Sequence, residues 1–268
     1  MATAATTTMT TPNCLNDQIV HRKSSMNSGF QFQQFYVRHD RCAMKVGTDG
    51  VLLGCWAPLP ESPVRILDVG TGCGLVAMMM AQREPKAQID AIDIDEMAVE
   101  QARENFAASP WSDRLHAFHS CLQDWQFVNG KCPNGKWYDL IVSNPPYFRN
   151  SLKNPDKARQ TARHTDTLSY EELLYHSARL LRENGLLVLI LPAETETEIR
   201  ALAAAEGLSL IRLTRIYSKE SKPARRVLIA LEKSASRNPL PVEDTLVLEN
   251  ETGGRSTAYQ KLAKDFYL

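Results

Sequence analysis

The strongest constraint on the fold of this chain is an alternation of strand-like and helix-like segments that begins at residue 64. Residues 64–69 are apolar and β-rich, 75–83 have helical periodicity, and 88–94 have the pattern of a strand again. Further strand-like segments follow at 115–119 and 138–143. Such alternation is typical of βαβ units, whose strands run parallel in one sheet. The sequence therefore predicts a doubly wound α/β fold.

The second half of the chain continues this pattern. Helical periodicity covers 169–182 and 194–206, and an apolar strand is expected between them at 185–191. Residues 208–217 and 226–231 are expected to pair as an antiparallel hairpin. We therefore expect seven strands, mostly parallel with one antiparallel strand, and helices on both faces of the sheet.

Composition limits the classes of protein to which the chain can belong. Hydrophobic residues make up 43% and charged residues 23%, as in a soluble globular domain. The 31 basic residues balance the 31 acidic ones, so a nucleic acid would have to meet local basic patches. No apolar stretch approaches the roughly 18 residues that cross a bilayer, so no membrane partner is expected. The six cysteines lack CxxC spacing, which favours reduced thiols and a cytoplasmic location.

A glycine-rich turn directly follows the first strand-like segment. Gly70, Gly72 and Gly74 let the backbone approach a ligand closely and adopt unusual φ and ψ angles. Asp93 ends the next strand, where a carboxylate can accept hydrogen bonds from ribose hydroxyls. The pattern predicts a crevice for an adenosine-containing ligand.

Two ligands are compatible with this turn. Residues 72–77 also match the G-x-G-x-x-A pattern of dinucleotide dehydrogenases. Asp68, just before the glycines, favours S-adenosylmethionine instead, because a carboxylate can receive its cationic amino group and would repel a pyrophosphate. The dehydrogenase and a purely structural turn stay open as alternatives.

The run Asn144, Pro145, Pro146 and Tyr147 follows a buried strand at the carboxyl edge of the predicted sheet, where open α/β folds bind ligands. An exocyclic amine conjugated to a ring is a poor nucleophile because its lone pair is delocalised. The Asn144 side chain and the Pro145 carbonyl can hold such an amine while it becomes tetrahedral and loses a proton. Tyr147 can stack on the flat ring. The run predicts methylation of a planar, conjugated nitrogen, and the alternative is a loop that merely ends a strand.

Other polar residues are ambiguous. Asp124 can accept a hydrogen bond from an adenine amine or be a solvated loop acid. The basic segments 149–167 and 219–226 can meet phosphate or be ordinary solvated surface. No metal site is expected, because the neighbouring histidines and cysteines alternate along a strand and lack the spacing of zinc ligands.

These runs closely resemble those of the bacterial valine-tRNA adenine-N6 methyltransferases. The resemblance is carried by residues 35–50, 68–74, 143–147 and 266–268, and it extends from about residue 29 to the end. Members of that family use S-adenosylmethionine to methylate N6 of adenosine 37, beside the anticodon. The resemblance implies a Rossmann-like class I methyltransferase fold.

The resemblance also implies roles for individual residues. The residues implied to bind the cofactor are Lys45, Thr48, Asp49, Asp68, Gly70, Gly72, Gly74, Asp93 and Asp124. The residues implied to act on the target amine are Asn144, Pro145, Pro146 and Tyr147. The residues implied to bind the substrate are Tyr147, Arg163 and His164.

The expected organisation of the chain has four segments. These are a disordered tail over 1–29, a cofactor-side segment over 30–63, a methyltransferase core over 64–233 and an extension over 234–268 that packs on the core. The implied partner is the anticodon arm of valine tRNA. A monomer is expected rather than a dimer, without a metal ion.

Other acceptors share the chemistry of the Asn-Pro-Pro-Tyr run, namely a base amine in DNA or ribosomal RNA and a glutamine side-chain amide in a protein. A DNA enzyme is disfavoured because only about 35 residues follow the core, too few for a target-recognition domain. A glutamine methyltransferase is disfavoured because only a polar tail and a short segment precede the core. A non-catalytic RNA-binding module is disfavoured because Asn144 and all the glycines are present.

Overall fold

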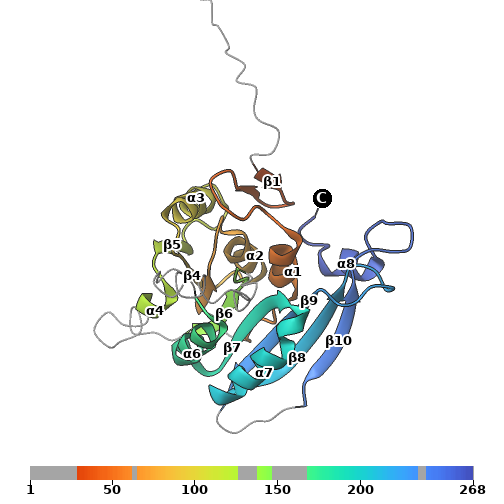
Figure 1. Ribbon diagram of the computed structural model, residues 1–268. Helices are drawn as coiled ribbons and strands as arrows, with labels where there is room; N and C mark the ends of the chain where they lie inside the picture. Colours follow the sequence, from red (N-terminus) through yellow and green to blue (C-terminus); the bar gives the residue numbers. More distant parts are fainter. Residues whose placement is uncertain (1–28, 62–64, 126–137, 147–167, 235–239, 268) are drawn as a thin grey trace, which may run out of the picture.

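The computed structural model describes residues 29–61, 65–125, 138–146, 168–234 and 240–267 (Figure 1). The strands are β1 (Gly29–Gln31), β2 (Tyr36–Arg38), β3 (Arg65–Val69), β4 (Gln88–Asp93), β5 (Leu115–His119), β6 (Tyr138–Ser143), β7 (Leu181–Pro192), β8 (Leu208–Tyr217), β9 (Arg226–Lys233) and β10 (Val242–Val247). The helices are α1 (Thr48–Trp56), α2 (Leu75–Arg83), α3 (Glu96–Ala107), α4 (Leu122–Trp125), α6 (Tyr170–Leu180), the 3₁₀ turn η3 (Ala193–Thr195), α7 (Glu196–Ala205) and α8 (Thr257–Leu262).

Eight strands form one twisted sheet in the order β10-β8-β9-β7-β6-β3-β4-β5. Within the described strands of this sheet, β9 alone runs against its neighbours, β7 and β8. The predicted, mostly parallel sheet with one antiparallel strand is confirmed. The predicted count of seven strands is wrong, because β10 pairs in parallel with β8 and adds an edge strand from the C-terminal extension.

Helices cover both faces of the sheet, as predicted. Alternate residues of a strand face opposite sides, so Ile66 of β3 packs with α1, α2 and α3, whereas its neighbour Leu67 packs with α6 and α7. The central strand β6 is buried along its whole length. Strands buried on both faces explain the continuous apolar runs in the sequence.

Local signals set the ends of the helices. Ser169 caps α6, since its hydroxyl accepts from the Glu172 backbone N–H and the Glu172 carboxylate accepts from the Ser169 N–H. The helix ends at Leu180, two residues before the predicted end, because the chain enters β7 at Leu181. Gly207, with φ of +70°, follows α7 and stops this helix.

The N-terminal and C-terminal ends of the described chain lie against each other. β1 and β2 form a small separate hairpin, and the Gln33 N–H donates to the Phe266 carbonyl at 2.9 Å. Phe32 and Phe266 belong to the same buried cluster as α1 and α2. The segment boundaries given above stay predictions, and residues 1–28 lie outside the described residues.

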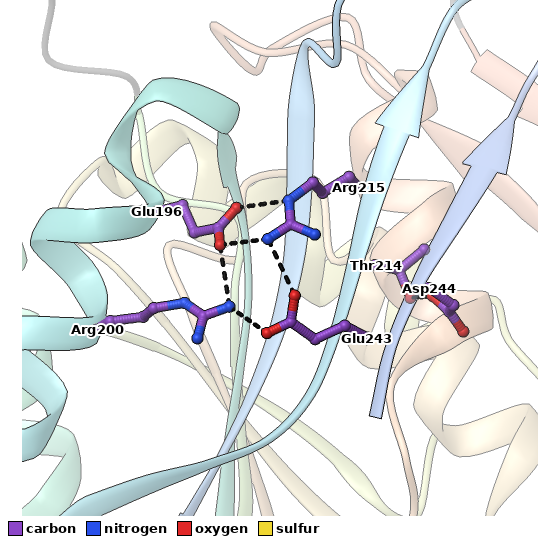
Figure 2. Close-up of polar contacts among 6 residues, drawn as sticks. All are labelled: Glu196, Arg200, Thr214, Arg215, Glu243 and Asp244. Carbon is purple, nitrogen blue, oxygen red and sulfur yellow. Dashed lines mark hydrogen bonds and ion pairs between the residues drawn. The ribbon is translucent and has the colours of Figure 1, made fainter. Parts of the chain in front are cut away.

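A ring of ion pairs joins the added edge strand to the rest of the sheet (Figure 2). Arg215 Nη2 of β8 lies 2.6 Å from Glu196 Oε1 of α7 and 3.1 Å from Glu243 Oε2 of β10. Arg200 Nη2 of α7 lies 2.6 Å from Glu243 Oε1 and 3.0 Å from Glu196 Oε1. All four side chains are partly exposed, so solvent screens each pair and the ring adds modest stability.

A second contact beside this ring is buried. Thr214 of β8 donates its hydroxyl proton to the Asp244 carboxylate of β10 and accepts from Trp56 Nε1 of α1 at 2.8 Å. Thr214 and Trp56 are both buried. One hydroxyl therefore links the edge strand, the sheet and the first helix.

We expect Thr214→Val to lower the free energy of unfolding by about 1–3 kcal/mol, because the buried Trp56 N–H loses its acceptor at nearly constant side-chain volume. The matched control Glu243→Gln weakens the exposed ring and should cost about 1 kcal/mol or less. Urea denaturation of both variants measures the two losses. An equal loss in the two variants, or a larger loss in Glu243→Gln, would contradict this assignment.

Candidate active site

The carboxyl ends of β3, β4 and β6 open into one cavity of about 730 Å³. This volume is in the range of small-molecule binding sites, and the position is where open α/β sheets bind ligands. Most of the residues singled out in the sequence line it. They are Lys45, Thr48, Asp49, Asp68, Gly70, Gly72, Asp93, Asn144, Pro145 and Pro146.

The glycine turn between β3 and α2 forms one wall of this cavity. Gly70 and Gly72 have φ of +71° and +55°, and the space where a Cβ would stand is open at both. These two positions need glycine for the left-handed backbone and leave room for a ligand. Gly74 differs, because a Cβ there would lie 2.4 Å from the Phe106 ring of α3, and it does not line the cavity. Its observed role is helix packing, and its predicted role in cofactor binding stays a prediction.

Asp68, at the end of β3, is buried and holds this turn through hydrogen bonds. Its Oδ2 accepts from the Thr71 hydroxyl at 2.7 Å and from the Ala77 backbone N–H at 3.1 Å. Burial raises the pKa of Asp68 to about 7, and the two hydrogen bonds act in the opposite direction. A buried carboxyl group that titrates near neutral pH is thus placed beside the cavity.

Asp93, at the end of β4, holds the same turn from the neighbouring strand. Its Oδ2 accepts from the Gly72 N–H at 2.8 Å, and its Oδ1 accepts from the Asp95 N–H at 3.0 Å. The next residue, Ile94, is 54% exposed and lines the cavity. A carboxylate and an apolar surface therefore lie side by side in the cavity wall.

The segment before α1 forms the opposite wall. Helix α1 begins at Thr48, and Gly47 is its N-cap residue. Lys45 precedes this start and lines the cavity together with the first turn of α1. Asp49 Oδ2 accepts from Arg226 Nε of β9 at 2.9 Å, which anchors the helix start to the sheet.

The Asn-Pro-Pro-Tyr run begins at Asn144, directly after β6. Ser143 is buried and donates its hydroxyl proton to the Val69 carbonyl of β3 at 2.7 Å, which fixes the strand end. Pro145 is buried, whereas Asn144 is partly exposed and its Nδ2 lies 3.8 Å from Met44 Sδ. The structure therefore brings Asn144 and Pro145 to the same cavity as the carboxylates of β3 and β4.

Besides Gly74, four of the predicted site residues are not placed in this cavity. Tyr147, Arg163 and His164 lie outside the described residues. Asp124 lies exposed on α4, where it is hydrogen-bonded to the Cys121 thiol and is not part of the cavity wall. The roles of these four residues stay predictions.

Sequence reasoning missed several cavity residues. They are Cys42, Met44, Ile94, Gln123 and Leu168. Gln123 precedes Asp124 in the sequence and lines the cavity where Asp124 does not. Only Ile94 carried a signal, since it directly follows the strand-ending Asp93, whereas nothing in the local pattern marks the others.

Within the described ranges, no cluster of three or more histidine, cysteine or acidic side chains is arranged to hold a metal ion. In the same ranges, no helix is both long and apolar enough to span a membrane.

Comparison with known proteins gives a consistent family. The family model of the methyltransferase small domain matches residues 51–205. The tRNA1(Val) (adenine(37)-N6)-methyltransferase of Bacteroides fragilis is 46% identical over 241 residues, which cover 89% of this chain and 97% of the relative. The enzyme of the same name from Parabacteroides distasonis is 48% identical over 242 residues, which cover 90% of this chain and 98% of the relative.

Solved structures share the fold at low sequence identity. A predicted O-methyltransferase from Agrobacterium tumefaciens has a TM-score of 0.62 at 21% identity, over 81% of this chain and 96% of that one. A protein described as a class I S-adenosylmethionine-dependent methyltransferase from Listeria monocytogenes has a TM-score of 0.52 at 15% identity, over 74% of this chain and 62% of that one. The sheet order, the cavity and these similarities agree, and the chain belongs to the methyltransferase small domain family and to the family of the tRNA1(Val) (adenine(37)-N6)-methyltransferases.

Proposed function

We propose that this protein transfers the methyl group of S-adenosylmethionine to the N6 amine of adenosine 37 in valine tRNA and releases S-adenosylhomocysteine. The observation that carries the proposal is the position of Asn144 and Pro145, which share one cavity with Asp68 and Asp93. Acceptors for a planar amine and carboxylates suited to a cationic nucleoside thus meet at one sheet edge. The names of relatives that align over most of this chain support the choice of tRNA and of the adenine amine.

The cavity fits S-adenosylmethionine through the chemistry of its walls. When bound, this cofactor supplies an electrophilic methyl group on a sulfonium ion. Asp68 would pair with the cationic amino group at its methionine end, and Asp93 would accept from the ribose hydroxyls while it keeps its bond to Gly72. The exposed side chain of Ile94 would cover an adenine face.

Asn144 and Pro145 would activate the target amine by holding it in the geometry for attack. The Asn144 side-chain oxygen and the Pro145 carbonyl would accept hydrogen bonds from the amine, so that its lone pair leaves conjugation and points at the methyl group. Pro145 lacks an N–H and is buried, so the backbone at this point is stiff. The amine proton then passes to solvent, and the attack gains most of its rate from alignment.

The target base must leave its stack to reach this run. Met44 is 49% exposed beside Asn144 and provides an apolar surface for a flat ring. Another amino group, in DNA, ribosomal RNA or a protein, stays the alternative substrate, because the chemistry of the run is the same for all of them. The tRNA assignment rests on the relatives.

The turn between β8 and β9 supports a docking side for the RNA. β8 runs parallel to β6 and β7 across β9, so this turn lies at the same sheet edge as Asn144. It carries Lys219, Lys222 and Arg225, of which the last two are exposed. Backbone phosphates of the anticodon arm can contact such side chains without sequence information.

We also propose a monomeric enzyme that acts in the cytoplasm. One chain supplies both the carboxylates for the cofactor and Asn144 for the amine, which supports a single chain as the active unit. The tRNA substrate supports the location.

We expect Asn144→Ala to reduce methyl transfer to valine tRNA by about 10²-fold or more, because an acceptor for the amine is lost. Transfer of labelled methyl to total tRNA, followed by nucleoside analysis, measures the rate and identifies the product. Cofactor affinity should stay within about twofold of the wild type, which separates catalysis from binding. Label in DNA or in a protein, with none in tRNA, would refute the substrate but not the reaction type.

We expect the affinity for S-adenosylmethionine to fall by about tenfold between about pH 8 and pH 6. The pKa of Asp68 is about 7, so the carboxylate that pairs with the cofactor's amino group is ionised above this pH and protonated below it. Isothermal titration at a series of pH values measures the slope.

The matched variant Asp68→Asn should bind weakly at every pH in this range. Because burial raises the pKa of Asp68 from 3.8 to about 7, its contribution to folding stability is full below about pH 4 and is lost progressively as the pH rises to about 7. At about pH 8 the wild type carries a buried charge that Asn lacks, so Asp68→Asn should be at least as stable as the wild type there, which excludes unfolding as the cause of weak binding. A pH slope that persists in Asp68→Asn would show that another group titrates.

We expect the double variant Lys222→Glu and Arg225→Glu to raise the KM for tRNA about tenfold and to reduce its salt dependence, while cofactor affinity is unchanged. The control is Lys86→Glu, since Lys86 is exposed just before β4, at the opposite edge of the sheet. Steady-state kinetics at several salt concentrations compare the variants. Equal changes in the KM for tRNA in the double variant and in Lys86→Glu would show that the β8–β9 turn does not contact the RNA.

A further inference from the structure

Two cysteine thiols face each other in the wall of the cavity. Cys42 lies in the segment between β2 and α1, and Cys73 lies in the glycine turn before α2. Their side chains are hydrogen-bonded to each other, and both line the cavity. Neither has a role in the reaction proposed above.

One buried amide holds the two cysteine segments together. The Nδ2 group of Asn105, on α3, donates to the Arg38 carbonyl and to the Cys73 carbonyl, both at 2.8 Å. Its Oδ1 accepts from the Arg38 N–H at 2.9 Å, and Gln101 Oε1 accepts from the Arg41 N–H at 3.2 Å. The contact between the thiols is therefore fixed by the backbone on both sides.

The two thiols differ in reactivity. The hydrogen bond from Cys42 lowers the pKa of Cys73, and the backbone N–H groups of Cys73 and Leu75 at the start of α2 act in the same direction, against burial. The same contact and partial burial raise the pKa of Cys42. Cys73 is thus the more acidic thiol of the pair, and Cys42 is the partly exposed thiol placed to resolve it.

We propose that this pair is an oxidation site, at which hydrogen peroxide converts Cys42 and Cys73 to a disulfide, and that this disulfide and the bound cofactor exclude each other. The second half rests on the cofactor cavity of the proposed function. The reagent class is a small peroxide, because the cavity admits it to Cys73 while the remaining described cysteines lack a thiol partner.

The reaction balances with one peroxide. The Cys73 thiolate attacks a peroxide oxygen, the O–O bond breaks, and the leaving hydroxide takes a proton to give water and a sulfenic acid. The Cys42 sulfur then attacks the Cys73 sulfur, the S–O bond breaks, and the Cys42 proton leaves with the hydroxide as a second water. Two thiols are oxidised, one peroxide is reduced to two waters, and a dithiol reductant reverses the change.

A disulfide here would alter the cavity itself. Sulfurs in a hydrogen bond must close to about 2.05 Å to form the bond, so the Cys42 segment would be drawn onto the glycine turn. Gly72 precedes Cys73 in this turn, and Met44 and Lys45 follow Cys42 in the segment. The glycine turn and the Cys42 segment, which form two walls of the cofactor site, would therefore move closer together and be held there by the covalent bond.

The test uses the full-length protein in reduced, peroxide-treated and re-reduced forms. Peptide mapping by mass spectrometry, with and without reductant, should find a Cys42–Cys73 link in the oxidised form. Isothermal titration with S-adenosylhomocysteine should show an affinity at least about tenfold lower after oxidation and its recovery with dithiothreitol. Because linkage is reciprocal, saturating S-adenosylhomocysteine should slow formation of the link by a similar factor.

Variants assign the effect to the pair. Cys42→Ser and Cys73→Ser are each compared with their own reduced form, and peroxide should no longer change their affinity. The controls Cys55→Ser and Cys121→Ser should keep the full response, because those thiols lie outside the pair.

The outcomes separate this inference from the proposed function. Absence of a Cys42–Cys73 link, or affinity unchanged in protein that carries the link, would overturn the inference while cofactor binding by the reduced protein stands. Failure of the reduced protein to bind the cofactor would instead overturn the proposed function and the exclusion together, and peptide mapping would still decide the oxidation site.

Discussion

Two buried or half-buried carboxylates hold the turn on which the whole site depends. Asp68 binds the Thr71 hydroxyl and the Ala77 N–H, and Asp93 binds the Gly72 N–H from the neighbouring strand. These bonds within the protein hold the left-handed backbone of the turn at Gly70 and Gly72. Because the strands are parallel, the same register that pairs β3 with β4 and β6 brings Asn144 to the rim of this turn.

Much of the fold was predictable because its signals are local. Periodicity placed the strands and helices of the βαβ units, and the helix ends depend on neighbouring groups such as the Ser169 hydroxyl. The eighth strand was not counted because its pairing is decided at long range. β10 is exposed along most of its length and joins the sheet through Thr214 and the ion pairs to Arg215 and Arg200.

The candidate site was predictable where a residue lies at the end of a strand or directly follows it, since strand ends converge in this topology. Asp68, Asp93 and Asn144 are all of this kind. Met44 and Cys42 reach the cavity on an irregular segment whose course is set by Asn105 and Gln101 of a helix far along the chain. Gly74 shows the opposite limit, since its place in the motif suggested a ligand but its neighbour is the Phe106 ring.

The geometry of the turn also supports one of the two cofactors that the glycine pattern allowed. A dinucleotide enzyme binds pyrophosphate with free backbone N–H groups at such a turn. Here the Gly72 and Ala77 N–H groups donate to carboxylates, and those of Gly70 and Thr71 donate to the Ile92 carbonyl. An anion at this position would have to displace protein acceptors and approach two carboxyl groups. A cationic amino group needs neither change. The turn therefore favours S-adenosylmethionine, because its backbone N–H groups already donate to acceptors within the protein.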